Sequence, residues 1–176
     1  QRLDREVNVW KDLRHRYVLR FIGLCKIEVD VYMVSPWMEK GESLKYVRNN
    51  PQIRCARLLA QVADGLEYLH TQTPQVVHGD VKVVNVLISG DGHAVIADFG
   101  LSHMVANVEL AYQQSSDGIQ AGNPRWQTPE LLTGLTIEDC RRTAQSDMFA
   151  FGRLMLEVGS GNRCWFIANE RIIYSS

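Results

Sequence analysis

The strongest constraint on the fold is an apolar stripe between Arg54 and His70. Its large apolar residues recur every three or four positions, as they do along one face of a helix: Leu58, Leu59, Val62, Leu66 and Leu69. An apolar stripe this wide is buried from solvent only if other parts of the chain pack against it. We therefore predict a long helix, buried in the core, against which the rest of the chain packs.

Helices and strands are both predicted around this stripe. The spacing of apolar residues predicts a helix over Leu3–Leu13 that ends near His15, and a second buried helix over Ala144–Val158. Runs rich in β-branched and aromatic residues predict strands, over Val18–Ile27, Glu28–Trp37, Val76–Val77, Val83–Ile88 and Ala94–Ala97. The first two strands pair antiparallel, the last two form a hairpin, and the polar stretch 101–127 forms a long mobile loop. This order predicts an α+β fold.

The composition excludes several classes of protein. The 176 residues fit one domain, and 45% hydrophobic with 22% charged residues is the balance of a globular chain rather than a disordered one. Lys and Arg number 19 and Asp and Glu number 20, so the net charge is −1, and no block of like charges could follow a phosphate backbone. We expect no nucleic-acid partner.

Neither a membrane span nor a metal or disulfide framework is predicted. A span needs about 20 apolar residues, and the best candidate, Met148–Val158, contains Arg153 and Glu157. The segment 1–12 is amphipathic, which is not the pattern of a secretory signal. The cysteines lie far apart without a C-x-x-C pair, which favours reduced structural thiols: Cys25, Cys55, Cys140 and Cys164. We expect a soluble, cytoplasmic protein.

Four polar residues could form one catalytic centre. Asp80 lies on a loop, Lys82 follows two places later and Asn85 five places later, and Asp98 follows beyond the predicted hairpin. Carboxylate and amide oxygens, together with substrate phosphates, are ligands of Mg²⁺. Phosphoryl transfer needs such a metal site, a group that orients the attacking hydroxyl, and a cation for the developing charge. The pattern therefore favours magnesium-dependent phosphoryl transfer.

Three segments resemble the motifs of eukaryotic protein kinases. His78–Asn85 resembles the catalytic loop H-R-D-L-K-x-x-N, Asp98–Gly100 is the D-F-G triplet, and Thr128–Glu130 resembles the A-P-E triplet that closes the activation segment. Their order and spacing are similar to those of the family. The resemblance implies a kinase catalytic domain with ATP and Mg²⁺ as cofactors and a protein as substrate.

The resemblance extends over nearly the whole chain, to about residue 166. Glu6 lies in a segment similar to helix C, Val31–Met38 is similar to strand 5 and the hinge, and Ser146–Gly152 is similar to the start of helix F. The matched pattern begins at helix C, so the Gly-rich loop and the strand-3 Lys of the family have no counterpart among these 176 residues. We therefore expect a fragment of a longer protein.

The resemblance also implies the architecture and the specificity. It implies an α+β, protein-kinase-like two-lobed fold, truncated to an incomplete small β lobe and an incomplete, mainly helical large lobe. The expected boundaries within this single partial domain (1–176) are 1–37 for the small lobe, 38–41 for the hinge and 42–176 for the large lobe. Lys82, two places after the loop acid, is the serine/threonine pattern, and Gly122–Trp126 resembles the tyrosine-kinase-like group.

The family's roles carry over onto the four polar residues. Asp80 would accept or orient the proton of the substrate hydroxyl, and Lys82 would contact the transferring phosphoryl group. Asn85 and Asp98 would hold Mg²⁺. These residues are the catalytic and metal-binding set that the resemblance implies.

The resemblance also implies a nucleotide site and a stack of side chains. Leu87 would lie under the adenine of ATP, the backbone between Pro36 and Met38 would hydrogen-bond its edge, and Ser35 would stand at the gatekeeper position. The stack would align the two lobes and is expected to contain Trp10, Phe21, His78 and Phe99, anchored by Asp147.

Two residues depart from the family pattern. Gly79 replaces an Arg that pairs with a phosphorylated activation-loop residue, and Asn123 replaces a Thr that ties the catalytic Asp and Lys together, a change that need not abolish activity because an amide both donates and accepts. The missing Gly-rich loop and strand-3 Lys leave one alternative open, a catalytically inactive, kinase-fold binding module. A more remote alternative is a small-molecule phosphotransferase of the aminoglycoside and choline kinase type. Such enzymes share the fold and often have the sequence His-Gly-Asp at this loop. Lys82 and the two triplets argue against this alternative.

Overall fold

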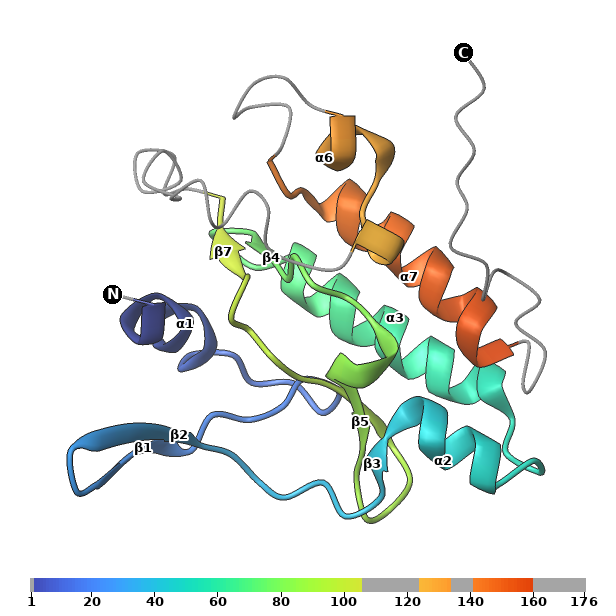
Figure 1. Ribbon diagram of the computed structural model, residues 1–176, viewed down its shortest axis with the longest axis horizontal. Coiled ribbons are helices and arrows are strands. Elements are labelled where there is room, and N and C mark those ends of the chain that lie inside the picture. The colour runs from blue at the N-terminus through green and yellow to red at the C-terminus, as the bar shows by residue number, and fades with distance from the viewer. Residues whose placement is uncertain (1, 106–123, 134–140, 160–176) are drawn as a thin grey trace.

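The computed structural model describes residues 2–105, 124–133 and 141–159. In chain order the elements are α1 (Arg2–Trp10), β1 (Gly23–Ile27), β2 (Asp30–Val34), β3 (Gly41–Glu42), α2 (Ser43–Asn49), α3 (Cys55–His70), β4 (Val76–Val77), the short helix η1 (Val83–Asn85), β5 (Val86–Ile88), β6 (Ala94–Ile96), β7 (His103–Met104), the short helix η2 (Pro124–Trp126), α6 (Pro129–Thr133) and α7 (Ala144–Gly159). The molecule is a mixed α and β structure with several helices and small sheets, as predicted (Figure 1).

The core forms around α3, which lies beside α7 and also packs against β6 (Figure 1). The predicted apolar stripe is the buried face of α3, and Leu58, Leu66 and Leu69 are among its buried residues. Gln61 is buried on the same face because its side-chain oxygen accepts the backbone N–H of Ala94, at 2.8 Å. The two buried helices are thus confirmed, and each of their ends lies within one residue of the predicted end.

Within the described ranges, three small antiparallel sheets lie around these helices: β1–β2, β3–β5–β6 and β4–β7. The predicted hairpin is β5–β6, in which Val86 pairs with Ile96. Ile88 and Ile96 are buried, as expected for short apolar strands between helices. The β5–β6 hairpin connects the loop at 78–85 to the Asp98 triplet. The register of its two strands therefore determines how the loop and the triplet are positioned relative to each other.

The predicted segment Val18–Ile27 forms a strand only from Gly23 onward. Before Gly23 the backbone instead pairs with the β5–β6 hairpin: Leu19 donates its N–H to the backbone oxygen of Ile96 at 2.8 Å, and Ile96 donates its N–H to that of Tyr17 at 2.8 Å. The two segments around residue 28 do pair antiparallel, but Glu28 turns the chain with a positive φ of 56°, so β2 begins only at Asp30.

Other element boundaries also differ from prediction. The helix α1 ends at Trp10, before Leu13: Lys11 still donates its N–H to Val7, but Leu13 donates to Trp10, three residues back, so the chain leaves the helix in a turn. The Trp10 indole N–H donates to the backbone oxygen of Leu19. The predicted strand Val83–Ile88 is a strand only from Val86, since its first three residues form η1. The short helices α2 and α6 were not predicted. Most of the predicted loop 101–127 lies outside the described residues.

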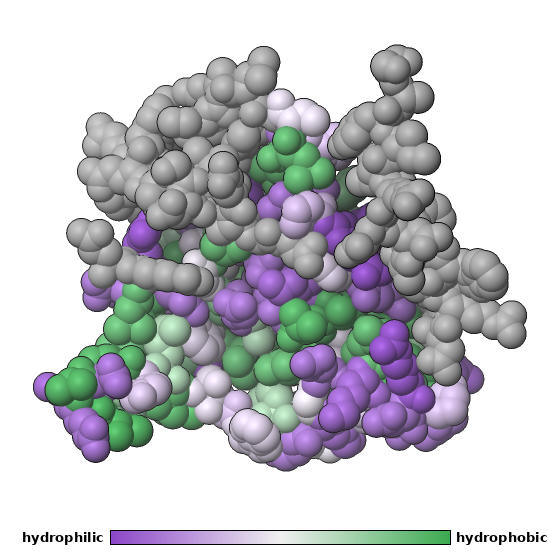
Figure 2. Space-filling model, in the orientation of Figure 1, coloured by the Kyte–Doolittle hydropathy of each residue, from purple (hydrophilic) through white to green (hydrophobic). Residues whose placement is uncertain are grey.

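The β1–β2 hairpin presents apolar side chains to solvent at one corner of the molecule (Figure 2). Exposed residues there are Ile22, Leu24, Ile27, Val29, Val31 and Tyr32. The strands pair only with each other among the described residues, and a two-stranded sheet by itself is marginally stable in water. Besides the chain segments at its base, Met33 of β2 holds the hairpin to the body, because its half-buried side chain packs against the core.

Membrane and cysteine predictions can be compared with the described residues. No helix among them is both long and apolar enough to cross a membrane. Cys25 is an exposed free thiol on β1, and Cys55 is a half-buried free thiol at the start of α3. Cys140 and Cys164 lie outside the described residues.

Candidate active site

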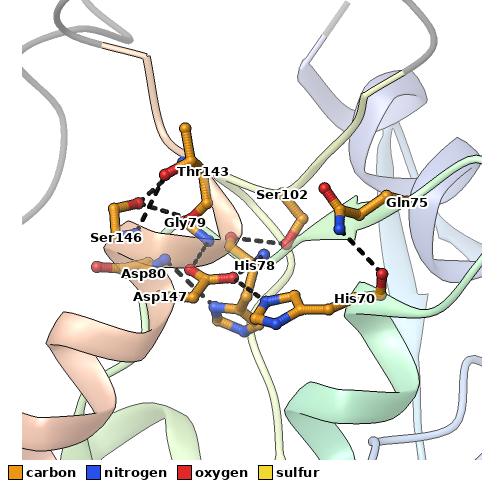
Figure 3. A network of polar contacts seen from close by, with 9 residues as sticks. All are labelled: His70, Gln75, His78, Gly79, Asp80, Ser102, Thr143, Ser146 and Asp147. Atoms are coloured by element: carbon orange, nitrogen blue, oxygen red, sulfur yellow. Dashed lines mark hydrogen bonds and ion pairs between the residues drawn. The ribbon is translucent and has the colours of Figure 1, made fainter.

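The loop at residues 78–80 is anchored by one buried carboxylate, that of Asp147 in the first turn of α7 (Figure 3). Its Oδ2 accepts the backbone N–H of His78 at 2.8 Å, and its Oδ1 accepts that of Gly79 at 2.8 Å. Its Oδ2 also lies 2.9 Å from His70 Nε2 at the end of α3. Asp147 is only 1% exposed. It therefore joins α3, α7 and the loop at a single point.

The position of Asp147 is set by how α7 begins (Figure 3). Thr143 and Ser146 exchange hydrogen bonds: the Thr143 N–H donates to Ser146 Oγ at 2.9 Å, and the Ser146 N–H donates to Thr143 Oγ1 at 3.2 Å. Such reciprocal bonds satisfy the first donors of a helix. The N-terminal end of a helix also favours negative charge, which stabilises the buried carboxylate there.

Three of the predicted catalytic residues meet at one carboxylate oxygen. The Nζ of Lys82 lies 2.6 Å from Asp80 Oδ2, and the Nδ2 of Asn85 donates to the same oxygen at 3.0 Å. Asn85 Nδ2 also donates to the backbone oxygen of Asp80 at 2.9 Å. The Asp80 side chain is 11% exposed and that of Lys82 20%. The loop is thus folded so that the acid, the cation and the amide form one cluster.

Asp98 lies on a segment tied to this cluster through the backbone. Asn85 accepts the N–H of Ala97 at 2.8 Å, and His78 Nε2 lies 3.1 Å from the Ala97 oxygen. The next residue, Asp98, has a positive φ of 67° and is exposed, and one of its carboxylate oxygens accepts the Gly100 N–H at 3.2 Å. The triplet therefore turns sharply after β6 and presents an acid to solvent.

The donor set fits a magnesium ion. Because the amide nitrogen of Asn85 donates to Asp80, its side-chain oxygen is left to face elsewhere. Asp98 presents an exposed carboxylate, which could be a second oxygen ligand. The described residues contain no group of three or more His, Cys, Asp or Glu that could enclose a metal. Mg²⁺ is commonly held by one or two protein oxygens together with substrate phosphates, so this open arrangement suits it.

The predicted stack of side chains is present. The ring of Trp10 stacks on that of Phe99 with centroids 5.6 Å apart, and Phe21 and His78 extend the stack at 5.2 Å on either side. Phe99 and His78 are fully buried. The backbone N–H of His78 donates to Asp147, so the stack runs from α1 through the triplet and the loop to α7.

The predicted nucleotide residues lie after β2 and on β5. Ser35 directly follows β2 and is half-buried, and Met38 and Leu87 both pack against the core. The end of the predicted hinge lies along β5, where Lys40 donates its N–H to Ile88 at 3.1 Å. The structure therefore places the predicted hinge beside the strand that carries Leu87.

The described cavities do not join these nucleotide residues to the catalytic cluster. Pro36 and Met38 line a cavity of about 290 Å³, but it extends toward His93 and contains neither Leu87 nor Asp98. The assignments of Ser35, Pro36, Met38 and Leu87 to ATP remain predictions.

A smaller cavity lies directly beside the catalytic cluster. Its volume is about 20 Å³, and its lining includes Gly79, Asp80, Trp126 and Gln127. Trp126 and Gln127 precede the triplet Thr128–Glu130, whose proline is the first residue of α6. The segment that closes with this triplet thus forms one wall beside Asp80.

Two basic residues of the site were missed by sequence reasoning. His70 contacts Asp147, and Arg142, only 7% exposed, lies against Gly79. Burial lowers the pKa of Arg142 below its ordinary value, an effect opposed by the nearby carboxylates of Asp80 and Asp147. Neither position has a sequence signal: His70 ends the helix α3 eight residues before the loop, Arg142 lies more than 60 residues after it, and the packing of α3 and α7 brings both side chains to the loop.

Comparison with known proteins identifies the family. A sequence profile described as "Protein tyrosine and serine/threonine kinase" matches residues 1–172. The chain is 32% identical over 167 residues to a probable serine/threonine-protein kinase drkB of Dictyostelium discoideum, with 92% of this chain and 22% of that protein covered. It is 30% identical over 162 residues to the human serine/threonine-protein kinase TNNI3K, with 89% and 18% covered.

The chain thus spans about a fifth of the length of these curated relatives. The catalytic loop, the D-F-G triplet and the stack around it have the arrangement expected from the motifs. The chain belongs to the protein tyrosine and serine/threonine kinase family.

Proposed function

We propose that this chain carries the phosphoryl-transfer centre of a serine/threonine protein kinase that uses ATP and Mg²⁺. One observation carries the proposal: the Lys82 ammonium and the Asn85 amide converge on Asp80 Oδ2, at 2.6 and 3.0 Å. An acid fixed by a cation and an amide, on a loop anchored to a buried carboxylate, is what in-line transfer to a hydroxyl requires.

Each residue of the cluster has one task. Asp80 holds its Oδ2 against Lys82 and Asn85, which leaves its other oxygen to orient the hydroxyl of the substrate and to accept its proton. Lys82 stays beside this carboxylate and contacts the transferring phosphoryl group through its remaining N–H donors. The anchoring of the loop by Asp147 keeps these groups from moving relative to one another.

Asn85 and Asp98 would hold the magnesium ion through their side-chain oxygens. Mg²⁺, when bound, neutralises negative charge on the phosphates of ATP. The hydrogen bond from Ala97 to Asn85 supports this assignment, because it fixes the segment that leads into Asp98 against the residue that would share the ion. We propose that the adenine binds at Ser35, the backbone over 36–38, and Leu87. This proposal is supported by the position of the hinge along β5.

A serine or threonine of a protein is the proposed acceptor. The relatives named above are described as serine/threonine-protein kinases, and Lys82 stands two places after the loop acid, as in kinases of that class. The wall that Trp126 and Gln127 form beside Asp80 supplies a surface on which a polypeptide could lie.

The test is transfer of labelled phosphate from ATP to a generic protein substrate, followed by identification of the labelled amino acid. Wild type is compared with Asp80→Asn and with Asp91→Asn, an exposed acid in the β5–β6 turn that serves as the control. The assay is run on this chain and on a form extended upstream by its coding sequence. We expect labelled serine or threonine that Asp80→Asn abolishes and Asp91→Asn preserves. If neither form transfers phosphate, a kinase-fold binding module becomes the better description.

A further inference from the structure

The backbone at Gly79 excludes any side chain while its neighbours stay where they are. Its φ is +78°, a conformation that favours glycine. A Cβ built on Gly79 would lie 2.7 Å from Cδ of Arg142 and 2.8 Å from the backbone oxygen of Leu101. Both distances are shorter than real Cβ contacts allow. The room beside the catalytic loop is therefore filled by Arg142.

Arg142 reaches this place from a different part of the chain. It lies five residues before Asp147, ahead of the first turn of α7, and only 7% of it is exposed. Burial lowers the pKa of Arg142, and the negative charges of Asp80 and Asp147 oppose that effect. The charge of Arg142 also acts on His103 of β7. The side chain thus lies where the loop, α7 and the β4–β7 sheet meet.

We propose that Arg142 is a positioning residue for the catalytic loop. Its side chain occupies the space that Gly79 leaves open and holds the backbone of Gly79 and Asp80 against the start of α7. In the family pattern described above the loop itself carries an arginine at position 79. Here the guanidinium comes from the segment before α7, and the glycine is what admits it.

The charges of the buried cluster support this assignment. Asp80 and Asp147 contribute two negative charges, and Lys82 and Arg142 contribute two positive ones. Loss of Arg142 removes one of these positive charges. It leaves Asp80 with Lys82, and Asp147 with His70 and two backbone N–H donors, and buried carboxylates with fewer compensating groups are unfavourable. The loop would then shift to bring a carboxylate nearer to water, which moves Asp80 away from its place beside Lys82.

The first test is amide hydrogen exchange, which needs no activity. Exchange is measured at Gly79 and Asp80 and, as an internal reference, across the β5–β6 hairpin, in wild type, Arg142→Ala, Arg142→Lys and the control Arg141→Ala. We expect Arg142→Ala to speed exchange in the loop by about tenfold or more while the hairpin is unchanged, with a smaller effect of Arg142→Lys. Equal acceleration in loop and hairpin, or an effect of Arg141→Ala of the same size, overturns the proposal.

The second test moves the guanidinium back to the loop. Gly79→Arg alone collides with Arg142, and Arg142→Ala alone leaves a void. The double variant removes the collision with Arg142 and fills the void, whereas the close approach to the Leu101 oxygen and the positive φ strain Gly79→Arg and the double variant equally. The thermal unfolding midpoint of the double variant should therefore lie above that of Gly79→Arg. If the unfolding midpoint of the double variant instead falls by the sum of the losses in the two single variants, the proposal that Arg142 fills the space left by Gly79 is overturned.

A third measurement rests on the proposed phosphoryl transfer. In whichever form transfers phosphate, Arg142→Ala should lower kcat on the order of tenfold to a hundredfold with KM little changed, because a misplaced group slows the chemical step. A loss confined to KM contradicts a positioning role. If no form transfers phosphate, the proposed function fails, whereas the exchange and unfolding results still decide the role of Arg142.

Discussion

Replacement of Asp147 should cost a large part of the stability of this chain. The carboxylate is 1% exposed and accepts the backbone N–H groups of His78 and Gly79, each at 2.8 Å, besides its contact with His70. In Asp147→Ala both N–H groups lose their acceptor in a place that water reaches poorly. A buried donor left unsatisfied costs about 1–3 kcal/mol, so the two together predict a loss of about 2–6 kcal/mol in the free energy of unfolding.

Urea unfolding followed by circular dichroism measures this loss, with Asp64→Ala as the matched control. Asp64 lies on α3 and is 53% exposed, and its carboxylate lies 3.5 Å from His15. An exposed pair of this kind contributes about 0–1 kcal/mol. If Asp147→Ala does not fold, Asp147→Asn, which keeps the shape and one acceptor oxygen, provides the measurement and should lose less. If Asp147→Ala loses no more free energy of unfolding than Asp64→Ala does, the anchoring of the loop by Asp147 is refuted.

Three further outcomes follow from the packing and the charges. Gly65→Ala in α3 should destabilise the chain, because the new Cβ would lie 3.0 Å from the backbone oxygen of Tyr17 and overpacking of about 1–3 kcal/mol exceeds the roughly 1 kcal/mol of helix propensity gained. Gly152→Ala in α7 meets nothing within 4 Å and should gain about 1 kcal/mol, so urea unfolding of the two variants should give opposite signs. Burial, together with two nearby arginines, lowers the pKa of His103 below its ordinary 6.5, so the unfolded chain binds more protons and stability should fall as the pH drops from 6.5 toward the lowered value. His103→Leu should flatten that part of the stability curve, and an unchanged slope would contradict the assignment. Trp10→Ala should cost about 3–5 kcal/mol, because it removes a buried ring from the stack, and a loss below about 1 kcal/mol in the same assay would count against the stack.

Much of the fold follows from periodicity, because long apolar stripes allow few alternatives. The stripe that became α3 and the apolar run that became α7 were predicted almost to the residue. The strand over Val18–Ile27 was overpredicted because β-branched residues favour extended backbone without saying which partner it finds. There the partner of residues 17–19 is Ile96, about 80 positions away, and local pattern carries no information about it.

The cluster of Asp80, Lys82 and Asn85 could be predicted as a group because its members lie within six residues of one another. Asp80 and Lys82 lie on one loop and Asn85 ends the short helix η1 that follows it, so short spacing allows the three side chains to meet. The supports of that loop lie elsewhere in the sequence: His70 at the end of one helix and Arg142 before another. Only the packing of the two helices places these side chains beside the loop, so the sequence gives no sign of them.

The most direct test of the proposed centre is calorimetric titration of ATP, with and without Mg²⁺, into this chain and into the form extended upstream. Wild type is compared with Asp98→Asn and with the control Asp91→Asn. We predict binding that depends on Mg²⁺ and weakens about tenfold or more in Asp98→Asn while Asp91→Asn binds as wild type does, because of these two acids Asp98 alone would contact the ion. Affinity that is the same without Mg²⁺, or that Asp98→Asn leaves unchanged, would contradict the assignment of this cluster to magnesium-dependent phosphoryl transfer.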